Sequence, residues 1–143
     1  MTRLFVDSSV WIDHLRGVDS RETRLLRGML RRLDPMIAEE GDDQTTIVVG
    51  DLVLVEVLRG IESDGQRRRV RDALLAFDVV QVGGIGTALA AAEHYAVLRR
   101  IGQTVRKAID CLIAAWCIEH AVPLLHADRD FLPLARHRGL ELA

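Results

Sequence analysis

The sequence predicts an α/β fold in which a mostly parallel sheet of four or five strands is flanked by helices. Short apolar runs alternate along the whole chain with longer stretches of helical periodicity, which is typical of βα units. The apolar runs are nearly continuous, as expected for strands that are buried on both faces. The chain has 143 residues and no repeat, low-complexity tract or linker, so we expect a single domain over residues 1–143.

The first expected elements are one strand and two helices. Residues 4–6 are apolar and are followed by an acid, so they predict a buried strand. Ser8 or Ser9 can cap a helix that continues to about Arg16. A second helix is expected over about residues 20–33, because its large apolar side chains recur with the 3.6-residue period of a helix.

A loop, a strand and a helix follow. Pro35 ends the second helix, and the acidic stretch 39–44 lacks a large apolar residue, which predicts a loop. Residues 47–49 are apolar and β-branched, and they predict a second buried strand. Asp51 is expected to cap the next helix, which is almost wholly apolar and ends near Gly60.

The second half of the chain continues the alternation of helix and strand. Helical periodicity marks its longer segments, glycine and proline separate them, and short apolar runs mark its strands. The expected elements are helices over about residues 64–76, 87–101, 105–119 and 131–137, strands at 79–80 and 124–126, and an edge strand at 140–142.

Composition limits the classes of function. The formal net charge of -2 argues against a protein that holds nucleic acid by overall charge alone, but it allows an enzyme with a local binding patch. The arginines within 67–71 read as a solvated helix face, and guidance of an RNA backbone by some of them is a further hypothesis.

Two further features bear on the compartment. Cys111 and Cys117 fit no disulfide or zinc pattern, and we expect both to be buried apolar side chains. The sequence has neither a signal-peptide pattern nor an apolar run of membrane-spanning length. We therefore expect a cytoplasmic protein with no membrane partner.

Four acidic residues stand in apolar surroundings. Asp7 directly follows the first expected strand, and Asp128 follows the strand at 124–126. Glu56 and Asp110 are each the only charged residue within an apolar helical stretch. A buried carboxylate is costly unless it is paired or binds a metal, and ligands of parallel sheets bind beyond the carboxyl ends of the strands. A single such acid can be explained by a solvent-exposed position on an otherwise buried helix. Four such acids on separate elements favour a shared site instead.

A cluster of carboxylates needs a cation, because mutual repulsion raises the pKa values of the acids. A hard divalent ion such as Mg²⁺ or Mn²⁺ prefers oxygen ligands and therefore suits this set. The five histidines are scattered and are expected mostly at the surface, so they form no competing site. The sequence thus predicts a metal site, able to activate water against a phosphodiester, at Asp7, Glu56, Asp110 and Asp128.

Three neighbouring residues each have two interpretations. The Ser9 hydroxyl could reach the metal site, although capping of the first helix is the more common role. Arg106 lies one helical turn before Asp110 and could orient that carboxylate or meet phosphate, although a surface ion pair is equally consistent. Asp130 could be a fifth ligand, although it could also cap the last helix, which is the interpretation we favour.

Four segments resemble the motifs of a known family. Residues 4–13 (LFVDSSVWID) resemble the opening of PIN-domain nucleases, specifically the VapC-type toxins of type II toxin–antitoxin systems. Residues 55–60 (VEVLRG), 106–114 (RKAIDCLIA) and 124–131 (LLHADRDF) resemble the second, third and fourth motifs of that family. The order and spacing of these motifs match the family across nearly the whole chain.

The resemblance implies a PIN-like three-layer α/β sandwich with Mg²⁺- or Mn²⁺-dependent endoribonuclease activity, in which a metal-activated water hydrolyses RNA. It also implies a homodimer that a VapB-type antitoxin neutralises in a hetero-oligomer. It assigns both catalysis and metal binding to Asp7, Glu56, Asp110 and Asp128.

The sequence departs from the family pattern in two places. His126 stands where many relatives have threonine or serine, which leaves open how Asp128 is supported. The stretch 34–46 is longer than usual, so substrate or antitoxin contacts in that stretch are not carried over.

Three other interpretations stay open. A phospho-receiver domain also binds Mg²⁺ through acids at strand ends, but it needs a lysine after its last core strand. The only lysine, Lys107, precedes the fourth expected strand. A non-catalytic PIN-like module would have a broken acidic set, whereas this set is intact. The sequence does not distinguish a toxin from a housekeeping RNA-processing nuclease of the same family. A small antitoxin gene immediately upstream would decide between these two functions.

Overall fold

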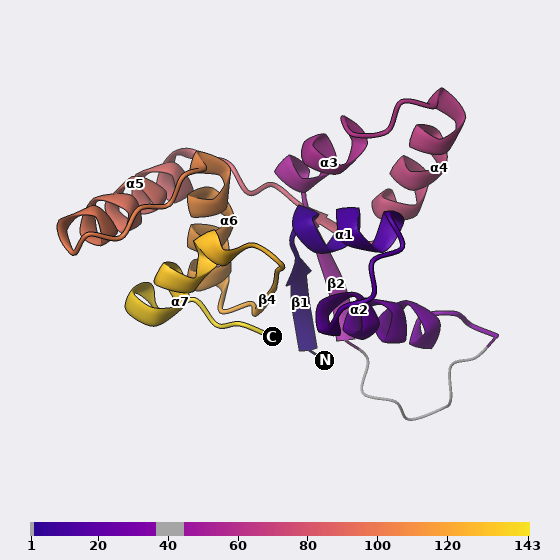
Figure 1. Cartoon of the computed structure of the whole chain (residues 1–143), viewed down its shortest axis with the longest axis horizontal. Coiled ribbons are helices and arrows are strands. Elements are labelled where there is room, and N and C mark those ends of the chain that lie inside the picture. The colour runs from indigo at the N-terminus through magenta and orange to yellow at the C-terminus, as the bar shows by residue number, and fades with distance from the viewer. Residues whose placement is uncertain (1, 37–44) are drawn as a thin grey trace.

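The computed structural model describes residues 2–36 and 45–143, so the loop expected at 39–44 lies outside the described residues. Strands and helices alternate along these ranges (Figure 1). The elements are β1 (Thr2–Val6), α1 (Ser8–Leu15), α2 (Arg21–Arg32), β2 (Thr45–Gly50), α3 (Asp51–Leu58), α4 (Asp64–Leu75), β3 (Asp78–Val80), α5 (Ile85–Arg100), α6 (Ala108–His120), β4 (Leu124–Leu125), the 3₁₀ turn η1 (Arg129–Phe131) and α7 (Leu132–Arg138).

The strands form one parallel sheet in the order β3-β2-β1-β4. The register pairs Phe5 of β1 with Val48 of β2, and Val6 of β1 with Leu125 of β4. Because the strands run in one direction, the residues that follow β1, β2 and β4 emerge at the same edge of the sheet. The predicted α/β class and the predicted parallel sheet of four or five strands are both confirmed, and the sheet has four.

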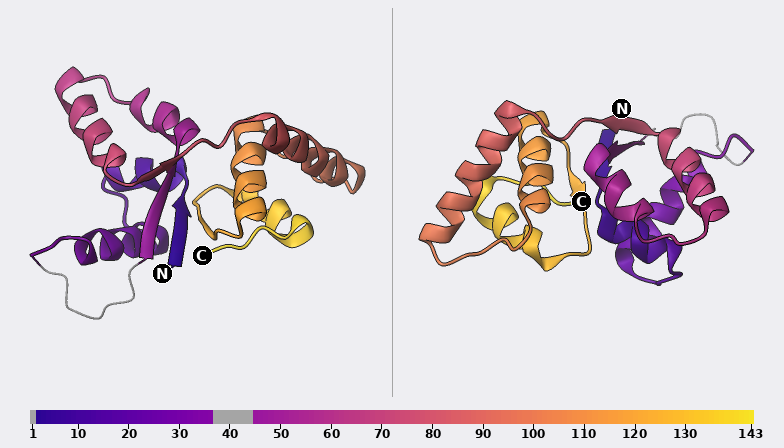
Figure 2. Two further views of the ribbon diagram at one scale, coloured as in Figure 1. Left: turned by 180° about the vertical axis from the view of Figure 1, so that it is seen from behind. Right: turned by 90° about the horizontal axis from the view of Figure 1, so that it is seen from above.

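Helices flank the sheet on both sides. Figures 1 and 2 show α5, α6 and α7 gathered on one side of β1, and α1 to α4 on the other. The core is built from the continuous apolar strands and from α6, whose Ile113 and Trp116 are buried. The Phe5 and Trp116 rings pack with their centroids 5.6 Å apart, which joins β1 to α6. No helix in the described ranges is both long and apolar enough to span a membrane.

The junction between β2 and α3 has no room for a side chain at Gly50. A Cβ there would lie 2.7 Å from a ring carbon of Phe5 and 2.7 Å from a methyl of Val82, and both side chains are fully buried. Gly50 is also the N-cap of α3, so the expected cap at Asp51 is wrong. Instead, the Asp51 carboxylate accepts hydrogen bonds from the backbone N–H of Leu52 at 2.9 Å and of Val82 at 3.0 Å.

Two other local expectations are wrong. α1 is capped by the side chain of Asp7 rather than by Ser8 or Ser9. The stretch at 140–142 forms only an isolated bridge between Leu142 and Leu124, because β4 is too short to pair with a full strand.

The burial of the cysteines agrees with the prediction, and the burial of the histidines agrees only in part. Both cysteines are buried and free, as predicted. The expectation of mostly surface histidines is wrong for His94, which is buried and accepts a hydrogen bond from Arg138 Nε at 2.8 Å. His14 and His126 are half-buried, whereas His120 and His137 are exposed.

Candidate functional site

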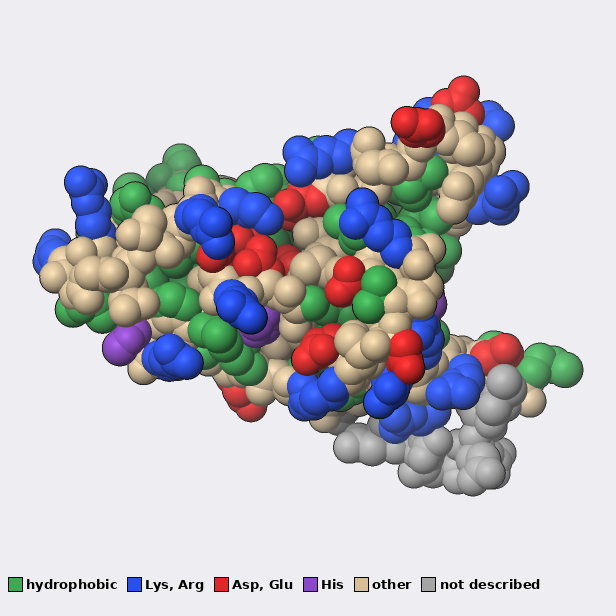
Figure 3. Space-filling view, viewed as in Figure 1, with side chains coloured by type: hydrophobic (Ala, Val, Ile, Leu, Met, Phe, Trp, Pro, Cys, Tyr) green, Lys and Arg blue, Asp and Glu red, His purple; other side chains and the backbone are tan. Residues whose placement is uncertain are grey.

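The four acids singled out in the sequence line one cavity of about 240 Å³. Asp7 follows β1 and Asp128 follows β4, and the pairing of Val6 with Leu125 brings these two strand ends together. Glu56 comes from α3 and Asp110 from the first turn of α6. The space-filling view shows acidic side chains with basic ones beside them on the face between α6 and α3 (Figure 3).

Asp7 is buried, with 2% of its surface exposed. Its Oδ2 accepts hydrogen bonds from the backbone N–H of Ser9 at 3.0 Å and from the Ser9 hydroxyl at 2.5 Å. Its Oδ1 is buried without a hydrogen-bond partner among the described residues. Burial raises the pKa of Asp7, although the bonds from Ser9 oppose this shift. One oxygen of Asp7 is therefore fixed, and the other is available to a ligand.

Ser9 belongs to the site through its contact with Asp7 rather than through capping. Its hydroxyl also accepts a hydrogen bond from the backbone N–H of Ala127 at 3.0 Å. Because Ala127 directly precedes Asp128, this bond ties the end of β1 to the segment after β4.

Asp110 is the second buried carboxylate, with 3% of its surface exposed. Its pKa is raised to about 7, chiefly by burial and in addition by the neighbouring charges of Asp7 and Asp128. Its Oδ2 is also buried without a partner among the described residues. Two unpartnered carboxylate oxygens in one cavity are costly unless a cation binds them.

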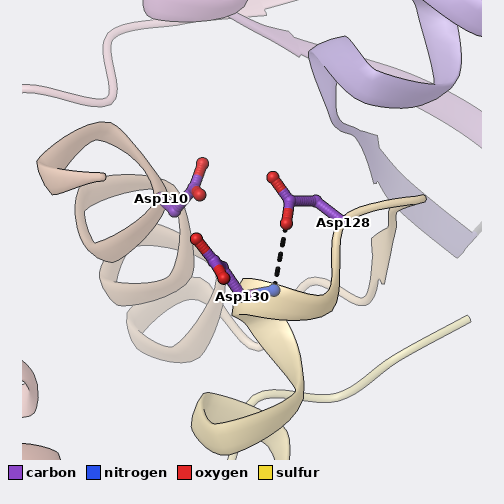
Figure 4. A group of neighbouring side chains, drawn as sticks. All are labelled: Asp110, Asp128 and Asp130. Atoms are coloured by element: carbon purple, nitrogen blue, oxygen red, sulfur yellow. Dashed lines mark hydrogen bonds between the residues drawn. The ribbon is translucent and has the colours of Figure 1, made fainter. Parts of the chain in front are cut away.

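Asp128 and Asp130 lie beside Asp110, and one carboxylate oxygen from each lies within 4.8 Å of the other two (Figure 4). Asp128 is the N-cap of η1, and its Oδ1 accepts from the backbone N–H of Asp130 at 3.0 Å. The predicted capping of the last helix by Asp130 is therefore wrong, because Asp128 caps η1 and the N-cap of α7 is Phe131. Asp130 instead joins the acidic group.

Glu56 is held by a residue that the sequence did not single out. Its Oε1 accepts a hydrogen bond from the hydroxyl of Ser8 at 3.1 Å, and Ser8 is itself buried. The one sequence feature that could have indicated a role for Ser8 in the site is its position next to Asp7. That position is equally consistent with the start of a helix.

His126 supports the segment around Asp128, at the position where many relatives have threonine or serine. The backbone N–H of Asp128 donates to His126 Nδ1 at 3.1 Å, and the ring packs against Phe131 with centroids 5.1 Å apart. Burial lowers the pKa of His126, which favours the neutral ring that this acceptor role requires.

Three basic side chains lie near the acids, of which Arg59 and Lys107 line the cavity and Arg106 pairs with Asp130. Arg106 lies 3.6 Å from Asp130 and its side chain is 82% exposed, so its ion pair is with Asp130 and not with Asp110. The expected spacing of one helical turn fails because α6 begins only at Ala108. Lys107, which we had not assigned to the site, lines the cavity and places its Nζ 3.4 Å from Asp128 Oδ2.

The residues present fit a hard divalent cation. The potential ligands are carboxylate oxygens, which Mg²⁺ and Mn²⁺ prefer, and they come from four different segments of the chain. The unpartnered oxygens of Asp7 and Asp110 give an independent reason for a cation in this cavity. Within the described ranges no histidine belongs to a comparable group of metal-binding side chains.

Comparison with known proteins gives one family. The model of the family described as PIN domain matches residues 4–137. Curated relatives include the VapC ribonuclease Mb1587 of Mycobacterium bovis and the ribonuclease VapC11 of Mycobacterium tuberculosis. Each is 28% identical to this chain over 140 residues, which cover 98% of this chain and 97% of the relative.

Solved structures of similar fold are toxin–antitoxin complexes. VapBC2 from Rickettsia felis, bound to a DNA fragment from its promoter, aligns with a TM-score of 0.68 and 16% identity over 99% of this chain and 98% of that chain. DNA-bound VapBC from Salmonella typhimurium aligns with a TM-score of 0.66 and 13% identity, covering 100% and 98%. A toxin–antitoxin complex from Klebsiella pneumoniae aligns with a TM-score of 0.58 and 21% identity, covering 96% and 94%.

Proposed function

Because the chain belongs to the PIN domain family, we propose that it is a divalent-metal-dependent endoribonuclease and the toxin of a VapBC toxin–antitoxin pair. The observation that carries the proposal is the convergence of four carboxylates on one cavity, with two of their oxygens buried and unpartnered among the described residues. The ribonuclease names of the relatives support the same activity. The phospho-receiver alternative loses its support, because the matching family model is a different one.

In this proposal Asp7, Glu56 and Asp110 hold the cation, and Asp128 completes the site. A bound Mg²⁺ or Mn²⁺ would supply a Lewis acid that lowers the pKa of water and offsets charge on a phosphodiester. Asp130 lies close enough to Asp110 and Asp128 to act as a further ligand.

The surrounding residues orient these carboxylates. The Ser9 hydroxyl fixes one oxygen of Asp7 and leaves the other without a hydrogen-bond partner among the described residues. The Ser8 hydroxyl holds Glu56, and His126 holds the backbone at Asp128. Ligands held in this way lose little conformational entropy when a cation or a phosphate binds.

The decisive experiment is cleavage of total cellular RNA by purified protein with Mg²⁺ or Mn²⁺, beside an EDTA control. Asp110→Asn should abolish cleavage, because it removes a ligand charge while it keeps the side-chain volume. Asp72→Asn, an exposed acid on α4 that pairs with Arg71, is the matched control and should cleave as wild type does. Products should carry 3′-hydroxyl and 5′-phosphate ends. Failure of folded wild-type protein to cleave with either metal, or equal cleavage by Asp110→Asn, would contradict the proposal.

The assembly belongs to the same proposal. The solved structures of similar fold are complexes of toxin with antitoxin, which supports a VapB-type antitoxin as the partner of this chain. We further propose that the chain is one PIN domain over residues 1–143, that it forms a homodimer and that it acts in the cytoplasm. Light scattering of the purified protein, alone and with the product of a small gene immediately upstream, gives the mass of each assembly. Loss of RNA cleavage on adding that product would separate toxin duty from housekeeping RNA processing.

A further inference from the structure

We propose that the ammonium group of Lys107 binds a phosphate oxygen of the RNA when a divalent cation occupies the acidic cavity. The inference rests on the proposed ribonuclease function and adds a substrate-binding residue to it. Lys107 is the only lysine of the chain and the basic side chain that hydrogen-bonds within the group of acids.

The position of Lys107 is set by the start of α6. Its backbone is extended at φ -111° and ψ 124°, as the N-cap of that helix, and its carbonyl accepts a hydrogen bond from the backbone N–H of Asp110 at 3.2 Å. The side chain lines the cavity and places Nζ 3.4 Å from Asp128 Oδ2. The backbone is therefore fixed beside one proposed ligand, while the ammonium group reaches toward another.

Charge explains why this ammonium group would change partners. In the metal-free protein the carboxylates of Asp110, Asp128 and Glu56 all act on Lys107, which serves as a partial counter-ion for them. A divalent cation among the same carboxylates would repel the ammonium group. The contact to Asp128 is long and the Lys107 side chain is 59% exposed, so little holds Nζ in place once a cation binds.

The displaced ammonium group of Lys107 would bind a phosphate of the RNA, because the charges at this cavity otherwise disfavour the approach of RNA. Five acidic side chains line the cavity and repel a polyanion, so a phosphodiester needs cationic groups beside the cavity as well as a cation within it. An ammonium group on a flexible four-carbon stem can follow one phosphate oxygen as the cavity fills. Arg106 is less suited to this role, because it does not line the acidic cavity and lies instead beside Asp130, at 3.6 Å.

The test is Lys107→Met, which keeps the apolar stem and removes the charge. Two readouts should move in opposite directions. Mn²⁺ affinity of the protein alone, measured by titration calorimetry, should tighten by roughly 3- to 10-fold, because a competing positive charge is gone. The initial rate of cleavage of a labelled random-sequence RNA at subsaturating concentration should fall by about 10- to 100-fold, as expected for loss of a charge-assisted bond to phosphate.

Salt dependence gives a third readout. Each phosphate contact on a single strand contributes about 0.7 to the slope of log affinity against log salt, so Lys107→Met should reduce that slope in the cleavage assay by about this amount. Lys107→Arg should restore most of the rate and the slope, because it restores the charge. Arg100→Met removes one charge from an exposed residue at the end of α5, and it should change none of the three readouts.

The outcomes separate the proposal from its alternatives. If Lys107 merely holds Asp128 in place, Lys107→Met should weaken both Mn²⁺ binding and cleavage, and that joint loss would overturn the inference. An unchanged rate and salt slope in Lys107→Met, with active wild type, would also overturn it while the nuclease function stands. A wild-type protein that binds Mn²⁺ but cleaves no RNA would instead remove the proposed function on which the inference depends. Thermal unfolding of each variant verifies that it is folded.

Discussion

The Ser9 hydroxyl makes two contacts that fix Asp7 relative to the segment after β4. It donates to Asp7 Oδ2 at 2.5 Å and accepts from the backbone N–H of Ala127 at 3.0 Å. Neither contact is an ion pair, so neither depends on long flexible side chains that must be ordered. At this scale the acids owe their positions to short hydroxyl side chains and to backbone groups.

Ser9→Ala should destabilise the metal-free protein by about 1–2 kcal/mol, because the N–H of Ala127 and one oxygen of Asp7 lose a partner. It should also weaken Mn²⁺ binding, because Asp7 is no longer held. Urea unfolding and titration calorimetry measure the two effects. Ser63→Ala, which removes the exposed cap of α4, is the matched control: it should lower stability without changing Mn²⁺ affinity. Unchanged metal affinity in Ser9→Ala would contradict this role.

Asp110 should make the stability of the metal-free protein depend on pH. Its pKa is 3.8 in the absence of the fold and about 7 in it, chiefly because of burial. Between these values the unfolded chain has lost the proton while the folded protein keeps it, so stability falls as pH rises from about 4 to about 7 and then levels. Urea unfolding in EDTA across this range measures the decline.

The same group should make metal binding pH-dependent, because a cation and a proton compete for Asp110. The increase in unfolding temperature on adding Mn²⁺ should therefore be small at pH 5.5 and larger at pH 8. Asp110→Asn should flatten both the decline in EDTA and the increase with Mn²⁺. A metal-free protein that gains stability between pH 4 and pH 7, with Asp110→Asn behaving alike, would show that other groups dominate.

At the scale of elements, the junctions between strands and helices position the site. β2 passes directly into α3 at Gly50, and this direct turn sets where Glu56 lies along α3. α6 begins at Ala108, which places Asp110 in its first turn and leaves Lys107 as the extended residue before it. A helix that began one turn earlier would make Lys107 helical and so turn its side chain in another direction.

Gly50→Ala should destabilise the protein by about 1–3 kcal/mol, because the new methyl would overlap the buried side chains of Phe5 and Val82. Gly86→Ala in the first turn of α5 is the matched control, since a Cβ there meets nothing within 4 Å. That change should leave stability within about 0.5 kcal/mol or raise it slightly. Thermal and urea unfolding compare the two variants, and equal effects would mean that β2 shifts easily to accept the methyl.

The sequence predicts the presence of the helices and strands better than it predicts the residues at which they begin and end. The strands β1, β2 and β4 were predictable, because buried parallel strands appear in sequence as continuous apolar runs. The edge strand β3 is largely exposed and was predicted from Val79 and Val80 alone. The caps were not predictable, since serine and aspartate both favour the N-cap and only three-dimensional contacts decide between Asp7 and Ser8. The partner of Arg106 was missed for a related reason, because it depends on the residue at which α6 begins.

At the scale of the whole molecule, the cavity draws its side chains from both sides of the sheet. Glu56 comes from the group of helices α1 to α4, and Asp110 comes from the group α5 to α7 (Figure 2). The acids themselves could be singled out from sequence, because each interrupts an apolar stretch. The contributions of Ser8 and Lys107 could not, because their contacts join segments that are distant in the sequence. For Asp130 the sequence left two roles open, a ligand and a helix cap.

A cation bound between the two groups of helices should stabilise both of them. Hydrogen exchange followed by mass spectrometry, with and without Mg²⁺, should show slower exchange in peptides that cover the first turns of α1 and α6 and the turn η1. The amides concerned are those of Ser9, Asp110 and Asp130, which hydrogen-bond beside the acids. Peptides from α4 should exchange at the same rate in both conditions. Protection confined to η1 would mean that the cation binds Asp128 and Asp130 alone.

The hydrogen bond between Ala127 and Ser9 joins residues that are 118 positions apart. During synthesis on the ribosome, β1 and Asp7 emerge long before the segment that must pair with them. A nascent chain that has not released residues 124–128 lacks β4, the bond from Ala127 to Ser9 and the carboxylate of Asp128. A messenger RNA under translation would therefore face an inert polypeptide, and the capacity to cut would arise only after release of that late segment.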